Sequence, residues 1–235
     1  MANIIGIVPK GELYTEDTNM KDRYYLLNNY IKRVTEAGGA AVGVAPVDGW
    51  VPRQTLELFD GFVVQGGSQY FPYHFQIVHH AVETGKPYLG ICLGMQIIRS
   101  YFEIRRRVEA AGYEGDLLQA IWNLQCNKDF DTLGSVEGHF NPLAPRGRED
   151  EAKHKVNIVP GTLLHRLMGR KQIVGASYHH SCVPADESFL TVNAWAEDGT
   201  VEGVEYGKNI LGVQFHPEVD EKLPELFAFL MEENK

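Results

Sequence analysis

The sequence lacks a long hydrophobic run. Its 235 residues contain no uninterrupted apolar stretch of about 18 residues, the length that spans a membrane as a helix. Its first residues, MANIIGIVPKGE, have neither the basic start nor the extended apolar core of a secretory signal. These absences predict a soluble, cytoplasmic protein that does not work at a membrane.

An excess of basic residues is also missing. Lys and Arg together number 22 against 31 Asp and Glu, which gives a formal net charge of −9 and a pI near 5.5. Nucleic-acid phosphates and anionic lipids attract basic surfaces, so this balance argues against nucleic-acid and membrane partners. A small-molecule substrate is the partner that fits best.

Cysteine is scarce. The chain has three, Cys92, Cys126 and Cys182, which is an odd number at spacings that match no zinc-finger pattern. Neither a disulfide framework nor a structural metal site is therefore expected from them, and reduced thiols fit a cytoplasm.

What the first half does contain is an alternation of apolar runs with segments of helical spacing. At 235 residues and 44% hydrophobic content, we expect one domain over residues 1–235. The expected strands are 3–8, 40–46, 61–67 and 87–91, and the expected helices are 21–38, 75–83 and 94–108. Continuously apolar strands separated by helices are typical of a parallel sheet that is covered on both faces.

The second half is less regular. Residues 109–126 include a further candidate helix, and residues 127–155 are polar and are expected to form loops. Four β-like runs follow at 171–177, 189–197, 201–206 and 210–215, with a hairpin signal in EDGT and an amphipathic helix over 223–233. The predicted fold class is α/β: a single-domain, flavodoxin-like sandwich with a mainly parallel central sheet flanked by helices, plus a smaller antiparallel sheet in the second half.

The stretch GICLGMQ places Cys92 between two glycines, after a predicted strand and before a predicted helix. A tight strand-to-helix turn exposes a nucleophile, and the helix amino terminus favours a thiolate. Ligands of open α/β sheets bind at this end of the strands. The alternative is that Cys92 is a small buried hydrophobic residue.

A nucleophile needs a base, and the stretch GVQFHPEVD offers one. His216 ends a β-like run, and Glu218 stands two residues further on. On an extended segment these two side chains point the same way, so the carboxylate can orient the imidazole. Taken alone, the pair also fits a surface histidine beside a solvated glutamate.

Together, the GG at 66–67, GICLGMQ and FHPE resemble the class I glutamine amidotransferase superfamily along the whole chain. The resemblance is closest to the peptidase C26-like branch, which includes gamma-glutamyl-gamma-aminobutyrate hydrolase. DRYYLLNNYIKRVTEAGGAAVGVAP, HKVNIVPGTLLHRLMG and ASYHHSCV point to that branch.

The resemblance implies a Cys-His-Glu triad. Cys92 matches the nucleophile, His216 the general base and later acid, and Glu218 the residue that orients the histidine. It also implies an oxyanion hole formed by the backbone N–H groups of Gly67 and Leu93. The implied reaction passes through a glutamyl thioester, and it requires neither a metal nor an organic cofactor.

The resemblance further implies a set of substrate-binding residues: Gly66, Gln96, Tyr178, His179 and His180. Spacing does not decide which of the two adjacent histidines faces the pocket. His139 is a weaker pocket candidate, whereas His74, His79, His80, His154 and His165 are interpreted as structural or surface residues.

Three positions depart from the branch pattern: Gln69 stands where aspartate is common, Leu93 where arginine is usual, and Ser181 where glutamine is common. The catalytic residues are therefore expected to be intact and the pocket for the leaving amine altered. Three functions stay open: a free-standing γ-glutamyl hydrolase, a glutaminase subunit that serves a synthetase partner, and a non-catalytic relative. The oligomeric state, including a homodimer, and the role of residues 109–152 also stay open.

Overall fold

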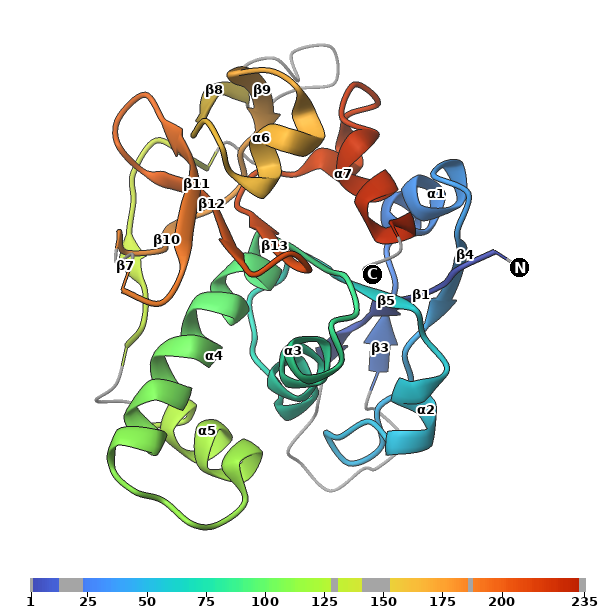
Figure 1. Cartoon of the computed structure of the whole chain (residues 1–235), viewed down its shortest axis with the longest axis vertical. Coiled ribbons are helices and arrows are strands. Elements are labelled where there is room, and N and C mark those ends of the chain that lie inside the picture. Colours follow the sequence, from blue (N-terminus) through green and yellow to red (C-terminus); the bar gives the residue numbers. More distant parts are fainter. Residues whose placement is uncertain (1, 13–22, 128–130, 141–152, 186–187, 233–235) are drawn as a thin grey trace.

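A computed structural model describes residues 2–12, 23–127, 131–140, 153–185 and 188–232. Its central feature is a sheet of nine strands (Figure 1). In spatial order the strands are β4 (Ala40–Gly43), β1 (Ile4–Val8), β5 (Gly61–Val64), β6 (Tyr88–Ile91), β13 (Ile210–Val213), β12 (Val201–Tyr206), β11 (Thr191–Ala196), β8 (Lys153–Ile158) and β9 (Gln172–Ala176).

The sheet has a parallel part and an antiparallel part that meet at β13. Strands β4, β1, β5, β6 and β13 pair in parallel, and β12, β11, β8 and β9 continue the sheet in antiparallel pairs. The predicted α/β class is thus confirmed, including the β11–β12 hairpin. Two further small antiparallel sheets pair β2 (Lys10–Glu12) with β3 (Arg23–Tyr25), and β7 (Gly134–Ser135) with β10 (Ser181–Cys182).

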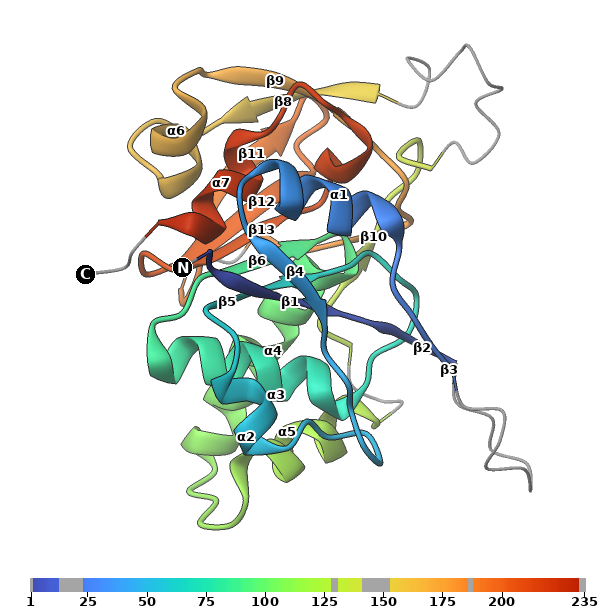
Figure 2. The same cartoon turned by 90° about the vertical axis from the view of Figure 1, so that its right-hand side faces the viewer.

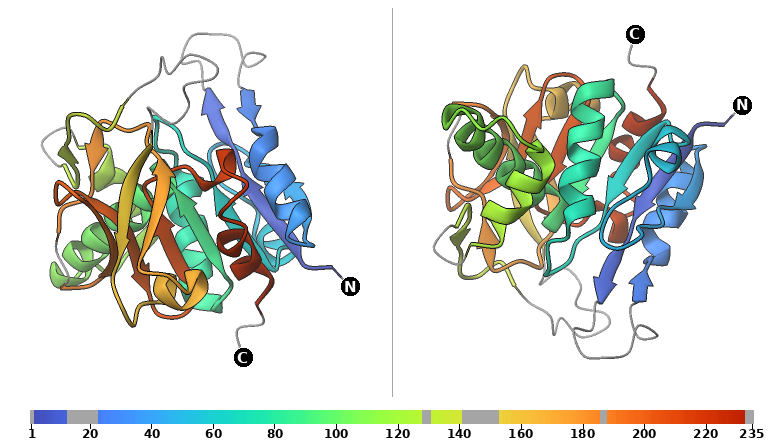
Figure 3. Two further views of the ribbon diagram at one scale, coloured as in Figure 1. Left: turned by 90° about the horizontal axis from the view of Figure 1, so that it is seen from above. Right: turned by 90° about the horizontal axis from the view of Figure 1, so that it is seen from below.

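Helices cover both faces of the sheet (Figures 2 and 3). One face carries α2 (Arg53–Glu57), α3 (Pro72–Thr84), α4 (Leu93–Ala110) and α5 (Leu117–Gln125). The other carries α1 (Asn28–Glu36), α6 (Leu163–Met168) and α7 (Glu225–Ala228), which is followed by the 3-10 turn η3 (Phe229–Met231). No helix in these described ranges is both long and apolar enough to cross a membrane.

Strand β5 shows why the parallel strands are apolar without alternation. Phe62 and Val64 belong to the hydrophobic core beneath α3 and α4, whereas Val63 belongs to the core beneath α1 and α7. All three side chains are fully buried. Each side chain of this size stabilises the fold by about 1.5–3 kcal/mol on burial, so both faces of the strand must be hydrophobic.

Two helix boundaries differ from the prediction. Within the segment expected to be helical from residue 21, Arg23–Tyr25 form β3 and the helix begins only at Asn28. Tyr25 instead donates a hydrogen bond to Glu12 across the β2–β3 hairpin, 2.8 Å long. The helix predicted over 223–233 is shorter in the structure, where α7 is followed by a 3-10 turn. Residue 233 lies outside the described ranges. So do residues 21–22, 128–130 and 141–152, which belong to the segments predicted as a helix from residue 21 and as loops over 127–155.

Candidate active site

Cys92 occupies the corner between β6 and α4 with a left-handed backbone, φ 53° and ψ −103°. A residue with a Cβ pays about 1–3 kcal/mol for such a conformation, which persists only where the surroundings enforce it. Here the enforcement is close packing: a Cβ on Gly90 would lie 2.5 Å from the Gly94 carbonyl carbon, and one on Gly94 would lie 2.6 Å from the Val64 oxygen. The two glycines therefore let strand and helix meet at the cysteine.

The same corner places the thiol at the amino end of an 18-residue helix. Unpaired N–H groups and the helix dipole make such a position favourable for negative charge. Strand β13 runs beside β6, and its Val213 carbonyl accepts a 2.8 Å hydrogen bond from the Cys92 N–H. The backbone of the nucleophile candidate is therefore anchored to the strand that leads to His216.

His216 and Glu218 form a close pair just after β13. The His216 Nδ1 lies 2.7 Å from the Glu218 Oε1. Burial lowers the pKa of His216, but the Glu218 carboxylate and the Cys92 thiol outweigh it and raise the pKa to about 10. The imidazole Nε2 is buried and has no hydrogen-bond partner among the described residues. At neutral pH the imidazolium form is thus favoured, with one nitrogen left for chemistry.

Tyr30, on α1, is a site residue that the sequence reasoning did not identify. Its hydroxyl donates to the Glu218 Oε1 at 2.8 Å and accepts from the Gly66 N–H at 3.0 Å. Arg33, one turn later, donates from Nε to the Glu218 carbonyl at 3.2 Å. Helix α1 therefore holds the Glu218 segment in place, and only the helical spacing of a buried tyrosine in the sequence hinted at this position.

The GG pair lies directly against these groups. A Cβ on Gly66 would come within 2.8 Å of the His216 Cε1, and one on Gly67 within 2.9 Å of the Leu93 Cδ2. Because the Gly66 N–H already bonds Tyr30, it is not available to a substrate oxygen. Gly66 is therefore needed for the close approach of this loop to the cysteine and histidine, whereas Gly67 lies against the end of the Leu93 side chain.

A cavity of about 470 Å³ opens over these residues. Its lining combines backbone and side chains from the elbow, the GG loop and the β2–β3 hairpin: Pro9, Lys10, Gly11, Glu12, Tyr25, Gln65, Gly66, Gly67, Ser68, Gln69, Phe71, His74, Cys92, Leu93, Tyr178 and His216. It accommodates a small ligand, and charged and polar groups of the hairpin face it.

Three predicted substrate-binding residues are not part of this lining. Gln96 is buried and bonds the Gln214 Oε1 at 3.2 Å and the Ser181 carbonyl at 3.4 Å. His179 is buried among other polar side chains, and exposed His180 packs its ring on Phe140. Their role in substrate binding stays a prediction, whereas Tyr178 reaches the cavity and its ring meets that of His216 edge-on at 5.5 Å.

Comparison with models of known protein families shows to which family the chain belongs. The model of the peptidase C26 family matches residues 3–77 and 72–218, which is most of the sequence. The chain belongs to the peptidase C26 family. The resemblance to this branch of the class I glutamine amidotransferases is thereby confirmed.

Individual relatives of this peptidase C26 protein share about a quarter of its sequence. A glutamine amidotransferase-like protein of Rickettsia prowazekii is 26% identical, and the match covers 83% of each chain. Protein NtpR of Enterococcus hirae is 26% identical over 93% of this chain and 92% of its own. The CTP synthase of Chlamydia felis is 27% identical over 86% of this chain, but the match covers only 39% of the synthase.

Solved structures support the fold assignment. The glutaminase domain of the Trypanosoma brucei CTP synthase, solved with bound acivicin, superimposes with a TM-score of 0.65 at 18% identity, covering 97% of this chain and 92% of that one. A GMP synthase subunit from Thermoplasma acidophilum gives a TM-score of 0.58 at 18% identity, over 98% and 93% of the two chains.

Proposed function

We propose that this protein hydrolyses the γ-glutamyl amide bond of a small γ-glutamyl amine through a Cys92–His216–Glu218 triad. The observation that carries the proposal is the convergence of a strained cysteine, an imidazole paired with a carboxylate and a glycine loop on one cavity. Family membership supports chemistry at an amide bond.

In the first step, the Cys92 thiolate attacks the amide carbonyl carbon and the carbonyl π electrons move to oxygen. The backbone N–H groups of Gly67 and Leu93 would stabilise this oxyanion, and each such donor is worth roughly 3 kcal/mol in the transition state. As the C–N bond breaks, the His216 imidazolium gives its Nε2 proton to the departing amine. The products are a glutamyl thioester on Cys92 and a neutral imidazole.

In the second step, the neutral His216 takes a proton from water, and the hydroxide attacks the thioester carbonyl. The C–S bond breaks, glutamate leaves, and the thiolate–imidazolium pair is restored. Glu218 keeps the imidazole oriented with its Nδ1–H toward the carboxylate and stabilises the positive charge. Tyr30 positions Glu218 and does not touch the substrate.

The β2–β3 hairpin supplies candidate contacts for the ends of the substrate. Lys10 and Glu12 place a cation and an anion at the cavity, and Ser68 and Gln69 add polar groups after the GG pair. A γ-glutamyl compound carries an α-carboxylate and an α-ammonium, which such a pair of charges can recognise. Because Gln69 replaces the aspartate common in this branch, the leaving amine is expected to differ from that of its relatives.

A second candidate function is that of a glutaminase which delivers ammonia to a separate synthetase. Its support is the similarity to CTP synthases and to a GMP synthase subunit, together with Leu93 after the nucleophile. This function predicts weak activity on glutamine alone and stimulation by a synthetase partner. The third function, a non-catalytic relative, requires an unreactive Cys92.

The test is glutamate release from glutamine and from a panel of γ-glutamyl amines by the purified chain. Cys92→Ala is run in parallel, with Cys126→Ala as a control because that thiol is exposed and remote from the triad residues in the sequence. Turnover of a γ-glutamyl amine well above that of glutamine, lost only in Cys92→Ala, is the expected result. Turnover of glutamine alone supports the glutaminase function, and turnover of neither overturns the hydrolase.

A further inference from the structure

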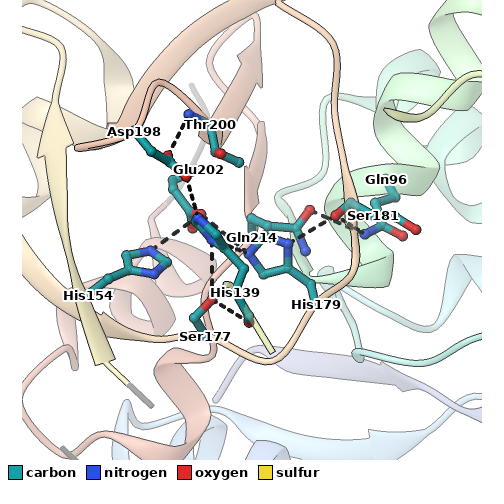
Figure 4. Close-up of polar contacts among 10 residues, drawn as sticks. All are labelled: Gln96, His139, His154, Ser177, His179, Ser181, Asp198, Thr200, Glu202 and Gln214. Atoms are coloured by element: carbon teal, nitrogen blue, oxygen red, sulfur yellow. Dashed lines mark hydrogen bonds and ion pairs between the residues drawn. The ribbon is translucent and has the colours of Figure 1, made fainter. Parts of the chain in front are cut away.

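A second polar cluster lies in the antiparallel half of the molecule, and the proposed hydrolysis does not use it. It joins His139, His154 on β8, His179 between β9 and β10, and Glu202 on β12 (Figure 4). His139, His179 and Glu202 are buried, and the Glu202 carboxylate has no exposed surface. Four segments far apart in the sequence thus direct ligand-type side chains to one point.

The distances within this cluster are short. Glu202 Oε1 lies 3.2 Å from the His139 Nδ1, 3.3 Å from the His179 Nε2 and 3.3 Å from the His154 Nε2. The distance between His139 Nδ1 and His179 Nε2 is 3.1 Å. Donor atoms around a tetrahedral Zn²⁺ at bond lengths near 2.0–2.1 Å are separated by about 3.3 Å, so this spacing is compatible with a metal site.

The outer nitrogens of the two histidines, His179 Nδ1 and His139 Nε2, face away from the cluster. Their contacts determine whether the inner nitrogens, His179 Nε2 and His139 Nδ1, carry lone pairs. His179 Nδ1 lies 3.0 Å from the Ser181 carbonyl, which can only accept, so this nitrogen carries the hydrogen. His139 Nε2 lies 2.9 Å from the Asp198 carboxylate and carries its hydrogen there. In the neutral rings, the inner nitrogens are therefore bare acceptors that face each other and a carboxylate.

Acceptors cannot satisfy one another. Neither oxygen of the buried Glu202 carboxylate has a partner with hydrogen-bond geometry among the described residues, and the same holds for the His154 Nε2. A buried carboxylate among converging lone pairs needs positive charge beside it, which either a metal ion or a proton on one of the histidines supplies.

We propose that His139 Nδ1, His179 Nε2 and the Glu202 carboxylate bind a divalent transition-metal ion of the Zn²⁺ class. His154 Nε2 or a water molecule completes the coordination. The contacts of the outer nitrogens match the pattern of metal-bound histidines, whose second N–H is held by a carboxylate or a backbone carbonyl. Histidine and carboxylate donors suit Zn²⁺ and are a poor set for Mg²⁺, which prefers oxygen.

The metal would fix the segment that carries Tyr178. Ser177 Oγ donates a hydrogen bond to the His139 carbonyl at 2.8 Å. The Ser181 carbonyl accepts hydrogen bonds both from His179 Nδ1 and from Gln96 Nε2 on α4. Residues 177–181 are thereby tied both to the cluster and to the helix that begins at Cys92. The ion has a structural role in this arrangement: it holds one wall of the cavity.

The experiment uses untagged Cys92→Ala protein as the reference, because this variant keeps the cluster and removes the cysteine as a competing metal ligand. After treatment with a chelator, the protein is titrated with Zn²⁺ against a chromophoric competitor of known affinity, and separately with Co²⁺. His179→Gln and Glu202→Gln are made in the same background. His165→Gln is the matched control, since His165 lies on α6 outside the cluster.

We expect about one Zn²⁺ per chain, with the visible absorption of tetrahedral Co²⁺, and affinity reduced more than about 100-fold in both cluster variants but not in His165→Gln. Zn²⁺, but not Mg²⁺, should raise the melting temperature of the reference protein, a readout that needs no cluster variant to fold. The absence of stoichiometric Zn²⁺, or its retention by both His179→Gln and Glu202→Gln, overturns the proposal and leaves a cluster that binds protons alone.

Discussion

The two halves of the sheet each carry a histidine–carboxylate group, and the two groups are built differently. After parallel strand β13, His216 shares only its Nδ1 with Glu218, and its Nε2 is without a partner among the described residues, beside the cavity and Cys92. In the antiparallel half, both nitrogens of His139 and of His179 are in contact with other groups. A histidine suited to proton transfer needs one nitrogen hydrogen-bonded to an orienting group and the other nitrogen accessible to the substrate. A histidine that binds a fixed cation needs its outer N–H hydrogen-bonded and its inner nitrogen directed at the cation.

The sharpest way to break this comparison is to replace one histidine from each half. His216→Gln should lower Cys92-dependent glutamate release by roughly 10⁴-fold, because both the acid and the base are lost. His179→Gln should lower it far less while weakening Zn²⁺ binding more than about 100-fold. Steady-state kinetics and metal titration on both proteins are the measurements, with His165→Gln as the shared control. Equal losses of turnover would contradict the division of roles.

The carboxylate of the proposed triad is the next target. Glu218→Gln keeps the size of the side chain but removes the charge that orients His216, and activity should fall about 10²–10⁴-fold. Glu57→Gln, which changes an exposed carboxylate that pairs with Arg53 on α2, is the control and should behave as wild type. Activity of Glu218→Gln within a fewfold of wild type would remove Glu218 from the mechanism.

The same substitution tests the pKa of His216. Since Glu218 and Cys92 outweigh burial and raise this pKa to about 10, the imidazolium should persist through neutral pH and kcat/KM should fall on the alkaline side. The folded-state pKa exceeds the unfolded value of about 6.5, so the associated stability is fully present below that pH and is lost as pH rises through 10. Histidine-resolved NMR titration of both proteins should show a lower His216 pKa in Glu218→Gln.

A smaller effect is expected at the glycine pair. Gly66→Ala should lower kcat about 100-fold, because its Cβ would displace the His216 ring, and displacements of about 1 Å carry costs of that order. Gly67→Ala should cost less, since its Cβ meets only the end of the flexible Leu93 side chain. Kinetics of the two variants side by side give the test, and the reverse ranking would count against the described geometry.

Tyr30→Phe should have the smallest effect on turnover, about tenfold, because Tyr30 acts through Glu218 and Gly66. Loss of its two buried hydrogen bonds should lower the free energy of unfolding by about 1–3 kcal/mol. Urea unfolding and the pH profile of kcat/KM check this, with Tyr206→Phe as the control at an exposed ring. A purely structural tyrosine would alter stability without moving the pH profile.

Features encoded by neighbouring residues could be predicted from the sequence. The apolar runs predicted the parallel strands because each strand is buried on both faces, and the glycines around Cys92 predicted its sharp corner. The pairing of His216 and Glu218, at 2.7 Å, was likewise predicted, but the extended segment expected to produce it is wrong, because Glu218 lies in a 3-10 turn over Pro217–Val219.

Features assembled from distant segments could not be predicted in this way. Tyr30 meets Glu218 across 188 residues of sequence, and the cluster around Glu202 combines His139, His154 and His179 from separate segments. Because single histidines carry no periodic signal, the sequence alone predicts a structural or surface role for His154 and only a weak pocket role for His139. The β2–β3 hairpin was also missed, since its tyrosines fit a helical spacing as well.

Selective labelling of the three cysteines tests the central claim most directly. Partial desolvation raises the pKa of Cys126 and of Cys182, whereas Cys92 faces the His216 imidazolium. A chloroketone analogue of glutamine, followed by peptide mass spectrometry at neutral pH, should modify Cys92 first, at a rate that falls in Glu218→Gln and that matches the loss of activity. Modification of exposed Cys126 as fast as Cys92, with activity retained, would contradict the account.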